Sequence, residues 1–148
     1  MSKIISYKGK LAIGLQDRIK LSTINGKVGY RIIKFQLFPT TPHTVDVALV
    51  CKIFKKDQTG SINATVDFTD SELIGVSSYE DKASSDKVTH ETILFDNEVT
   101  NQDIFVTMAD ADGNTTPANY YIELETMALS DIETTKLTLQ SIRTITSR

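Results

Sequence analysis

The chain has 148 residues, 40% of them hydrophobic and 24% charged, with a formal net charge of −3. These values suit one domain that buries a full core without a metal or disulfide staple. The negative charge argues against general nucleic-acid binding, which needs a basic surface to displace counterions from phosphates. No apolar run approaches the roughly 18 residues of a membrane span, so we expect neither a nucleic-acid nor a membrane partner.

The single cysteine and the amino-terminal residues bear on disulfide formation and on where the chain is synthesised. Cys51 is the only cysteine, so the chain cannot form an internal disulfide or a thiolate metal cluster. Cys51 lies on the apolar face of a predicted strand, and we expect it to be a small buried side chain. Met1–Lys8 lacks the apolar stretch of a signal peptide, which predicts synthesis in the cytoplasm.

The first third of the chain alternates apolar and polar residues, as strands do. We expect a polar, basic arm at Met1–Gly9, followed by one domain over residues 10–148. Strands are predicted at Lys10–Leu15, Arg18–Ile24, Val28–Phe38 and Val45–Phe54. Asn25-Gly26 favours a type I′ hairpin turn, because both residues tolerate positive φ. In the third strand, Ile33, Phe35 and Leu37 share one face.

The rest of the chain continues the pattern with polar interruptions. We expect Ser61–Phe68 to pair back on the fourth strand as a hairpin. Thr69–Leu73 resembles a helix start, with Thr69 or Asp70 as the cap, and Ser77–Thr89 is predicted as a surface loop. Further strands are predicted at Glu91–Asp96, Gln102–Met108 and Asn119–Met127.

The carboxyl end, Asp131–Arg148, fits two structures. Ser130 or Asp131 could cap a helix, whereas the threonines and the Leu137/Leu139 alternation favour a strand. We favour a short helical start followed by an extended tail.

These elements predict a mostly β fold: a single antiparallel β-sandwich, jelly-roll-like, with one or two short helices. The alternating apolar residues should form one core. They are Val47, Leu49, Cys51, Ile53, Ile62, Val66, Phe68, Ile104, Val106, Ile122 and Leu124.

The best candidate for a metal site is Asp110-Ala111-Asp112-Gly113-Asn114, whose acidic residues at alternate positions could wrap a calcium ion. The spacing differs from the EF-hand loop, in which glycine takes position six and glutamate position twelve. Here glycine takes position four, and Tyr121 stands at position twelve. Asp-Gly-Asn is also a frequent turn sequence, so we expect a plain turn, no metal site and no cofactor.

Catalytic patterns are weak. The only histidines, His43 and His90, fall in predicted polar or proline-rich loops, and no nucleophile-elbow sequence is present. Glu123 and Glu125 lie on one strand face, whereas glycosidase carboxylates usually come from separate elements. We therefore assign no catalytic residues.

Two surface features could bind partners. Tyr120-Tyr121 opens a predicted strand, so Tyr120 should face inward and Tyr121 outward, and one exposed ring is a weak binding signal. Lys52, Lys55 and Lys56 form a basic turn, which we interpret as a solubilising hairpin end.

Three stretches, Gly26–Pro39, Lys52–Asp81 and Ile93–Asp131, resemble small proteins from the structural-gene regions of marine tailed bacteriophages. The resemblance lies in the overall pattern and carries no catalytic signature. It implies a virion component: a capsid decoration or cement protein, or a neck or tail accessory protein.

The sequence therefore predicts a non-enzymatic virion structural protein that binds the major capsid protein or other virion proteins. We expect a homo-oligomer, with a trimer as one option, made in the host cytoplasm and located in the virion. The N-terminal arm is expected to order on a partner. A carbohydrate-binding or calcium-dependent adhesion module of the same fold is the alternative, and an exposed groove with aromatic rings would favour it. A β-sandwich hydrolase is the third reading.

Overall fold

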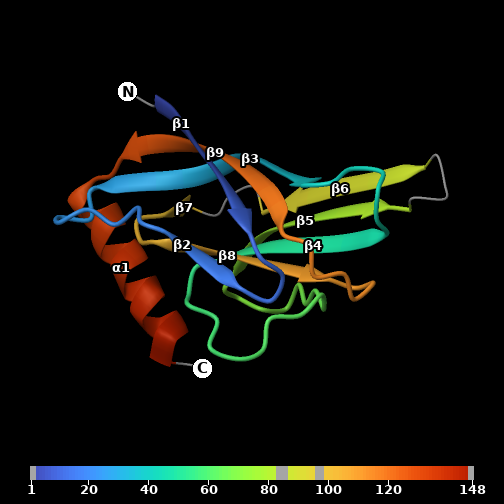
Figure 1. Cartoon of the computed structure of the whole chain (residues 1–148). Helices are drawn as coiled ribbons and strands as arrows, with labels where there is room; N and C mark the ends of the chain where they lie inside the picture. Colours follow the sequence, from blue (N-terminus) through green and yellow to red (C-terminus); the bar gives the residue numbers. More distant parts are fainter. Residues whose placement is uncertain (1–2, 83–86, 96–98, 147–148) are drawn as a thin grey trace.

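The computed structural model describes residues 3–82, 87–95 and 99–146, and its strands form two antiparallel sheets packed as a sandwich (Figure 1). Sheet A has the order β1 (Lys3–Leu11), β9 (Ala118–Ala128), β3 (Val28–Pro39) and β7 (Val99–Thr100). Sheet B has the order β2 (Gln16–Ile19), β8 (Ile104–Asp110), β4 (Val47–Phe54), β5 (Leu73–Asp81) and β6 (Val88–Leu94). The predicted antiparallel β-sandwich is confirmed.

The chain crosses between the sheets several times, so strands that are distant in sequence become neighbours. β1 and β9, from opposite ends of the chain, pair along the whole of β1. A jelly roll has eight strands in two Greek keys. The described part of this chain has nine strands, with β6 at the edge of a five-stranded sheet. The jelly-roll assignment stays a prediction.

The core lies between the two sheets, and strand alternation fills it. The inward side chains of β4 are at most 3% exposed, from Val47 to Ile53. The predicted core residues confirmed by their burial are Val47, Leu49, Cys51, Ile53, Ile104, Val106, Ile122 and Leu124. Burial raises the pKa of the Cys51 thiol well above its ordinary value, consistent with an apolar role for this residue.

A β-bulge in β3 corrects the predicted face of that strand. The register with β9 shifts between Ile32 and Lys34. Phe35 and Leu37 are each 2% exposed, whereas Ile33 is 36% exposed. The extra residue at the bulge removes Ile33 from the face that it would otherwise share with Phe35.

The predicted N-terminal arm is wrong for the residues that the structure describes. Lys3–Gly9 belongs to β1, whose partners run from Thr126, opposite Lys3, to Ala118, opposite Leu11. Ile5 and Tyr7 pack on the core, and Leu11 is buried within it. Two residues obscure the two-residue apolar period of this segment: Gly9 takes an inward position, and Ile4 is 61% exposed on the outer face. Deleting Met1–Gly9 would therefore remove most of a strand from sheet A.

The predicted hairpin of Ser61–Phe68 is also wrong. β4 already pairs with β5 on one side and β8 on the other, so its backbone has no open edge for a third partner. Val66 and Phe68 are 40% and 55% exposed, and Ile62 is only half-buried. The Phe68 ring instead meets Phe95 edge-on, with ring centroids 5.4 Å apart.

β5 occupies a segment predicted as a helix start and a loop. Asp70 makes a local turn, in which its Oδ1 accepts the Glu72 N–H at 2.9 Å, and no helix follows. Ser77, expected in the loop, is fully buried on β5 and bonds Thr92 across the strand pair. Pairing with β4 and β6 on both sides determines the strand, and local propensity does not reveal this.

Two further predictions concern the turn before β3 and the segment after β9. Gly26 has a φ of 66°, but Asn25 does not have positive φ, and β2 and β3 lie in different sheets. The type I′ hairpin is therefore wrong, although a turn is present. The helical start after β9 is confirmed, but the extended tail is wrong, because α1 (Asp131–Thr146) is helical throughout.

Asp103 joins β2 and its following loop to the start of β8. Its Oδ1 accepts the backbone N–H groups of Leu21 and Ser22, each at 2.9 Å, and its Oδ2 accepts the Arg18 Nε–H at 2.6 Å. Burial alone would raise the pKa of this carboxyl, but the hydrogen bonds from Ser22, Arg18 and Leu21 lower it to about 2.

Replacing Leu49 with alanine should lower the free energy of unfolding by about 2–5 kcal/mol, because a fully buried side chain is lost. Leu49 is 1% exposed, whereas Val66 is 40% exposed, so Val66→Ala is the control and should cost less than about 0.5 kcal/mol. Chemical denaturation of both variants measures the difference. Equal losses in the two variants would contradict the assigned core.

Asp103→Asn should destabilise the fold in a pH-dependent way. The depressed pKa means that Asp103 contributes its stability above about pH 4 and loses it as the pH falls through about 2. The gap in unfolding free energy between the two proteins should be on the order of 2 kcal/mol at neutral pH and should narrow between pH 4 and 2. Denaturation curves over this range measure it. A gap that stays constant down to pH 2 would rule out this role.

Candidate functional site

The strongest site-like feature is an open groove of about 770 Å³ at the end of sheet A where β9 begins. Residues of β1, β9 and β3 line it together with residues of β5 and β6 from sheet B. The β6 residue Thr92 donates a hydrogen bond from Oγ1 to the Phe35 carbonyl at 2.9 Å, which holds β6 against β3. The groove lining includes the rings of Phe38, Tyr79, His90, Tyr120 and Tyr121.

Strand register explains how the groove combines aromatic and amide side chains. On the outer face of sheet A, Phe38 stands opposite Asn119, and Gln36 stands opposite Tyr121. These four residues form a square. The rings of Phe38 and Tyr121 are diagonal neighbours, and the carboxamides of Gln36 and Asn119 occupy the other diagonal. Lys8 of β1 lies opposite Tyr121 on the other side of β9.

Tyr121 is held in place on this face. Its hydroxyl donates to Glu123 Oε2 at 2.8 Å, and this hydrogen bond raises the pKa of the phenol. The Lys34 ammonium lies 6.0 Å from the ring centroid and 4.0 Å from the same Glu123 carboxylate. Tyr121 is thus half-buried and outward, and Tyr120 is buried and inward, which confirms the predicted alternation.

His90 lies on β6 and not in a loop, and a hydrogen-bond chain orients its ring. Thr92 Oγ1 donates to Phe35, so Ser77 must donate its hydroxyl to Thr92, 2.9 Å away. Ser77 Oγ therefore accepts from His90 Nε2 at 3.3 Å. This order places the proton of neutral His90 on Nε2 and leaves Nδ1 as an acceptor.

His43 forms a separate pair with a buried carboxylate. Its backbone N–H donates to Asp81 Oδ2 at 2.8 Å, and its Nδ1 lies 3.3 Å from Asp81 Oδ1. His43 has a φ of 62°, an uncommon conformation that the backbone contact helps to hold. Among the described residues, serine contacts His90 and aspartate contacts His43, so the components of a hydrolase triad stand in two separate pairs.

The other candidates have structural partners. Glu123 lies beside Lys34, and Glu125 accepts from Arg31 at 3.0 Å, both on the outer face of β9. The interpretation of Lys52 as part of a solubilising hairpin end is wrong. Lys52 is only 7% exposed, burial lowers the pKa of its amine, and its Nζ donates to the Thr65 carbonyl at 2.7 Å.

The stretch Asp110–Asn114 forms a turn after β8, as predicted. Asp110 Oδ1 accepts the N–H groups of Ala48 and Asp112, at 3.2 and 2.7 Å. Asp112 Oδ2 pairs with Lys82 Nζ, and Asn114 Oδ1 accepts the Thr116 N–H at 2.6 Å. Within the described residues, no group of three or more His, Cys, Asp or Glu side chains is placed to hold a metal ion.

Sequence reasoning identified Tyr121 but missed the rest of the groove. Phe38 is 54% exposed, and its ring centroid lies 6.0 Å from that of Tyr79. The alternation that turns Leu37 inward also turns Phe38 outward, so the sequence held a signal for this residue. Tyr79 lies on β5, in the segment predicted as a loop, and His90 lies on the first half of β6, of which the predicted strand Glu91–Asp96 covers only the second half.

Comparison with protein-family models and with curated proteins finds no match for this chain. Within the described residues, no helix has the length and apolar character needed to cross a membrane.

We expect no calcium binding tighter than about millimolar at Asp110–Asn114, because its carboxylates already bond backbone N–H groups and Lys82. Calorimetric titration of the full chain with calcium chloride measures this. Micromolar binding that disappears in Asp110→Ala or Asp112→Ala would contradict the expectation.

Proposed function

We propose that this chain is a non-enzymatic structural protein of a bacteriophage virion, a capsid decoration or cement protein that binds the major capsid shell. A neck or tail accessory protein is the nearest variant of the same role. The resemblance of three long stretches to such proteins supports this proposal. A β-sandwich with a large buried core also suits a component that must stay folded on a particle surface.

The observation that carries the proposal is the position and surface of α1. Figure 1 shows the helix at one end of the molecule, beyond the two sheets. Ile132 is 82% exposed and Leu139 is 50% exposed. Helices in proteins gain most of their stability by packing an apolar face. A helix that leaves large apolar side chains in solvent is therefore suited to contact a neighbouring protein.

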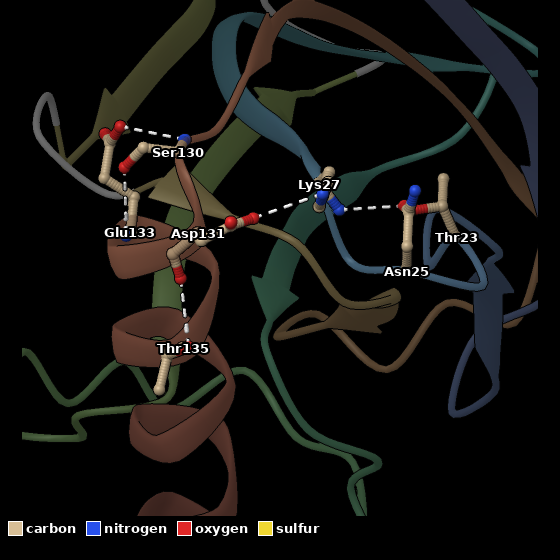
Figure 2. Close-up of polar contacts among 7 residues, drawn as sticks. All are labelled: Thr23, Asn25, Lys27, Ser130, Asp131, Glu133 and Thr135. Carbon is tan, nitrogen blue, oxygen red and sulfur yellow. Dashed lines mark hydrogen bonds and ion pairs between the residues drawn. The ribbon is translucent and has the colours of Figure 1, made fainter.

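The start of α1 is nevertheless firmly fixed, as Figure 2 shows. Ser130 and Glu133 form a capping box, in which each side chain accepts the other's backbone N–H, at 3.2 and 3.1 Å. Lys27 Nζ lies 3.1 Å from Asp131 Oδ1, and Asn101 Nδ2 donates to Thr138 Oγ1 at 3.3 Å. The helix is thus held in one direction relative to the sandwich.

Binding to a capsid shell can rest on many weak contacts between the shell and repeated copies of the protein. Copies bound to a symmetric shell act together, so each interface can be modest. The net charge of −3 is small, and apolar contacts should contribute more than long-range attraction. We propose that the protein acts as a homo-oligomer or as separate shell-bound copies, with α1 as the contact.

The test is co-sedimentation of the purified chain with virus particles that lack it. The double variant Ile132→Asp/Leu139→Asp should reduce the bound fraction at least about tenfold, because it places charges on the contact face. Leu15→Asp is the control: Leu15 is 56% exposed on a turn outside α1, so binding should be unchanged. Circular dichroism checks that all three proteins keep the same fold.

Two results would contradict the proposal. One is a chain that binds neither particles nor itself but turns over an ester, glycoside or phosphate substrate. The other is equal binding by the α1 variant and the wild-type chain, which would leave the virion role without α1 as its contact.

A further inference from the structure

The groove on sheet A exposes aromatic rings to solvent, and these exposed rings do not contribute to the core between the sheets. Phe38 is 54% exposed there, beside the half-buried Tyr121. The face of an aromatic ring carries partial negative charge and attracts the weakly positive C–H groups of a flat apolar surface. A pyranose ring has such a C–H surface, with hydroxyl groups around its edge.

Polar groups beside the rings match those hydroxyl groups. Gln36 and Asn119 each offer an amide N–H₂ donor and a carbonyl acceptor, so each can bond two neighbouring hydroxyls. His90 adds Nδ1 as an acceptor, because its Nε2 is committed to Ser77. An apolar protein segment would leave these donors and acceptors unpaired when it covered them, which costs binding energy.

The groove lining is positively charged, whereas the whole chain has a formal net charge of −3. Of the described residues that line the groove, Lys8 alone carries a formal charge. Lys10 lies two residues along β1 on the same face, opposite Asn119. Neither Lys8 nor Lys10 has a carboxylate partner among the described residues. An anionic ligand would pair with these ammonium groups.

From these three features we propose that the groove binds a carbohydrate chain that contains acidic sugars. One sugar ring stacks on Phe38 and Tyr121, its hydroxyls bond Gln36 and Asn119, and its carboxylate faces Lys8. The groove belongs to a single chain, so the isolated protein should bind without any particle. The proposal therefore goes beyond the virion role and can succeed or fail independently of it.

The probe is a hexasaccharide of β-1,4-linked mannuronate, and the neutral comparison is cellohexaose. Isothermal titration of the full chain should show binding to the uronate hexamer and at least about tenfold weaker binding to cellohexaose. Raising the salt from about 0.05 to 0.5 M should weaken uronate binding, because the lysines are exposed and their attraction is screened.

Matched phenylalanines provide the control. Phe38→Ala should weaken uronate binding at least about tenfold, whereas Phe68→Ala should change it less than about twofold. The two rings are 54% and 55% exposed, and Phe68 lies outside the groove. Phe38→Trp should keep the binding, since it retains a ring for stacking. Lys8→Gln should lower affinity for the uronate hexamer and reduce its salt dependence.

Several results would overturn the proposal. They are no heat from either probe at about 10 mM, equal affinity for the acidic and neutral hexamers, or equal effects of Phe38→Ala and Phe68→Ala. Analytical ultracentrifugation tests one more occupant, a second copy of the chain. Self-association that Phe38→Ala abolishes would identify the groove as a subunit interface instead.

Discussion

Tyr120 makes a hydrogen bond between the two sheets that depends on the strand register from which the core and the groove are built. Tyr120 points inward from β9, and its hydroxyl donates to Asp17 Oδ2 of β2 at 2.9 Å. Its ring lies over Gly9 of β1, where an added Cβ would stand 2.7 Å from the Tyr120 hydroxyl oxygen. Glycine is therefore required at position 9, because the Tyr120 ring approaches the backbone there too closely for a Cβ. A slip of one residue would turn Tyr120 outward and leave the half-buried carboxylate of Asp17 without this donor.

The same register determines the surface. When Tyr120, Ile122 and Leu124 fill the core, Asn119 and Tyr121 must lie on the outer face. β9 pairs with β1 and β3 over most of its length, so each outward residue acquires a defined neighbour on both sides. Core packing thus positions the groove side chains on a rigid three-strand platform, a condition for binding without a large ordering cost.

The sequence predicts the inward residues correctly on strands whose side chains alternate between a buried face and an exposed face. β4, β8 and β9 meet this condition, and their inward residues were predicted correctly. It predicts secondary structure wrongly where the pairing between strands overrides the local pattern of apolar and polar residues. Ser61–Phe68 alternates, but β4 has no free edge to pair with it. In β1 the inward Gly9 and the outward Ile4 interrupt the apolar alternation. β5 carries the buried Ser77, whose burial is tolerated because Thr92 and His90 of the neighbouring strand both bond its hydroxyl. The groove needs β5 and β6 as well as sheet A, which is why the sequence alone does not bring Tyr79 and His90 to it.

The geometry of β9 also keeps the two proposed surfaces apart. The groove residues Asn119 and Tyr121 lie near the start of β9, whereas α1 begins at Asp131, just beyond the end of β9 at Ala128. At about 3.3 Å per residue, the seven residues from Tyr121 to Ala128 span roughly 20 Å or more. A protein held to a shell through α1 would therefore leave the groove uncovered by that contact. Under the two proposals together, the sandwich would separate a surface for assembly, α1, from a surface for a carbohydrate, the groove.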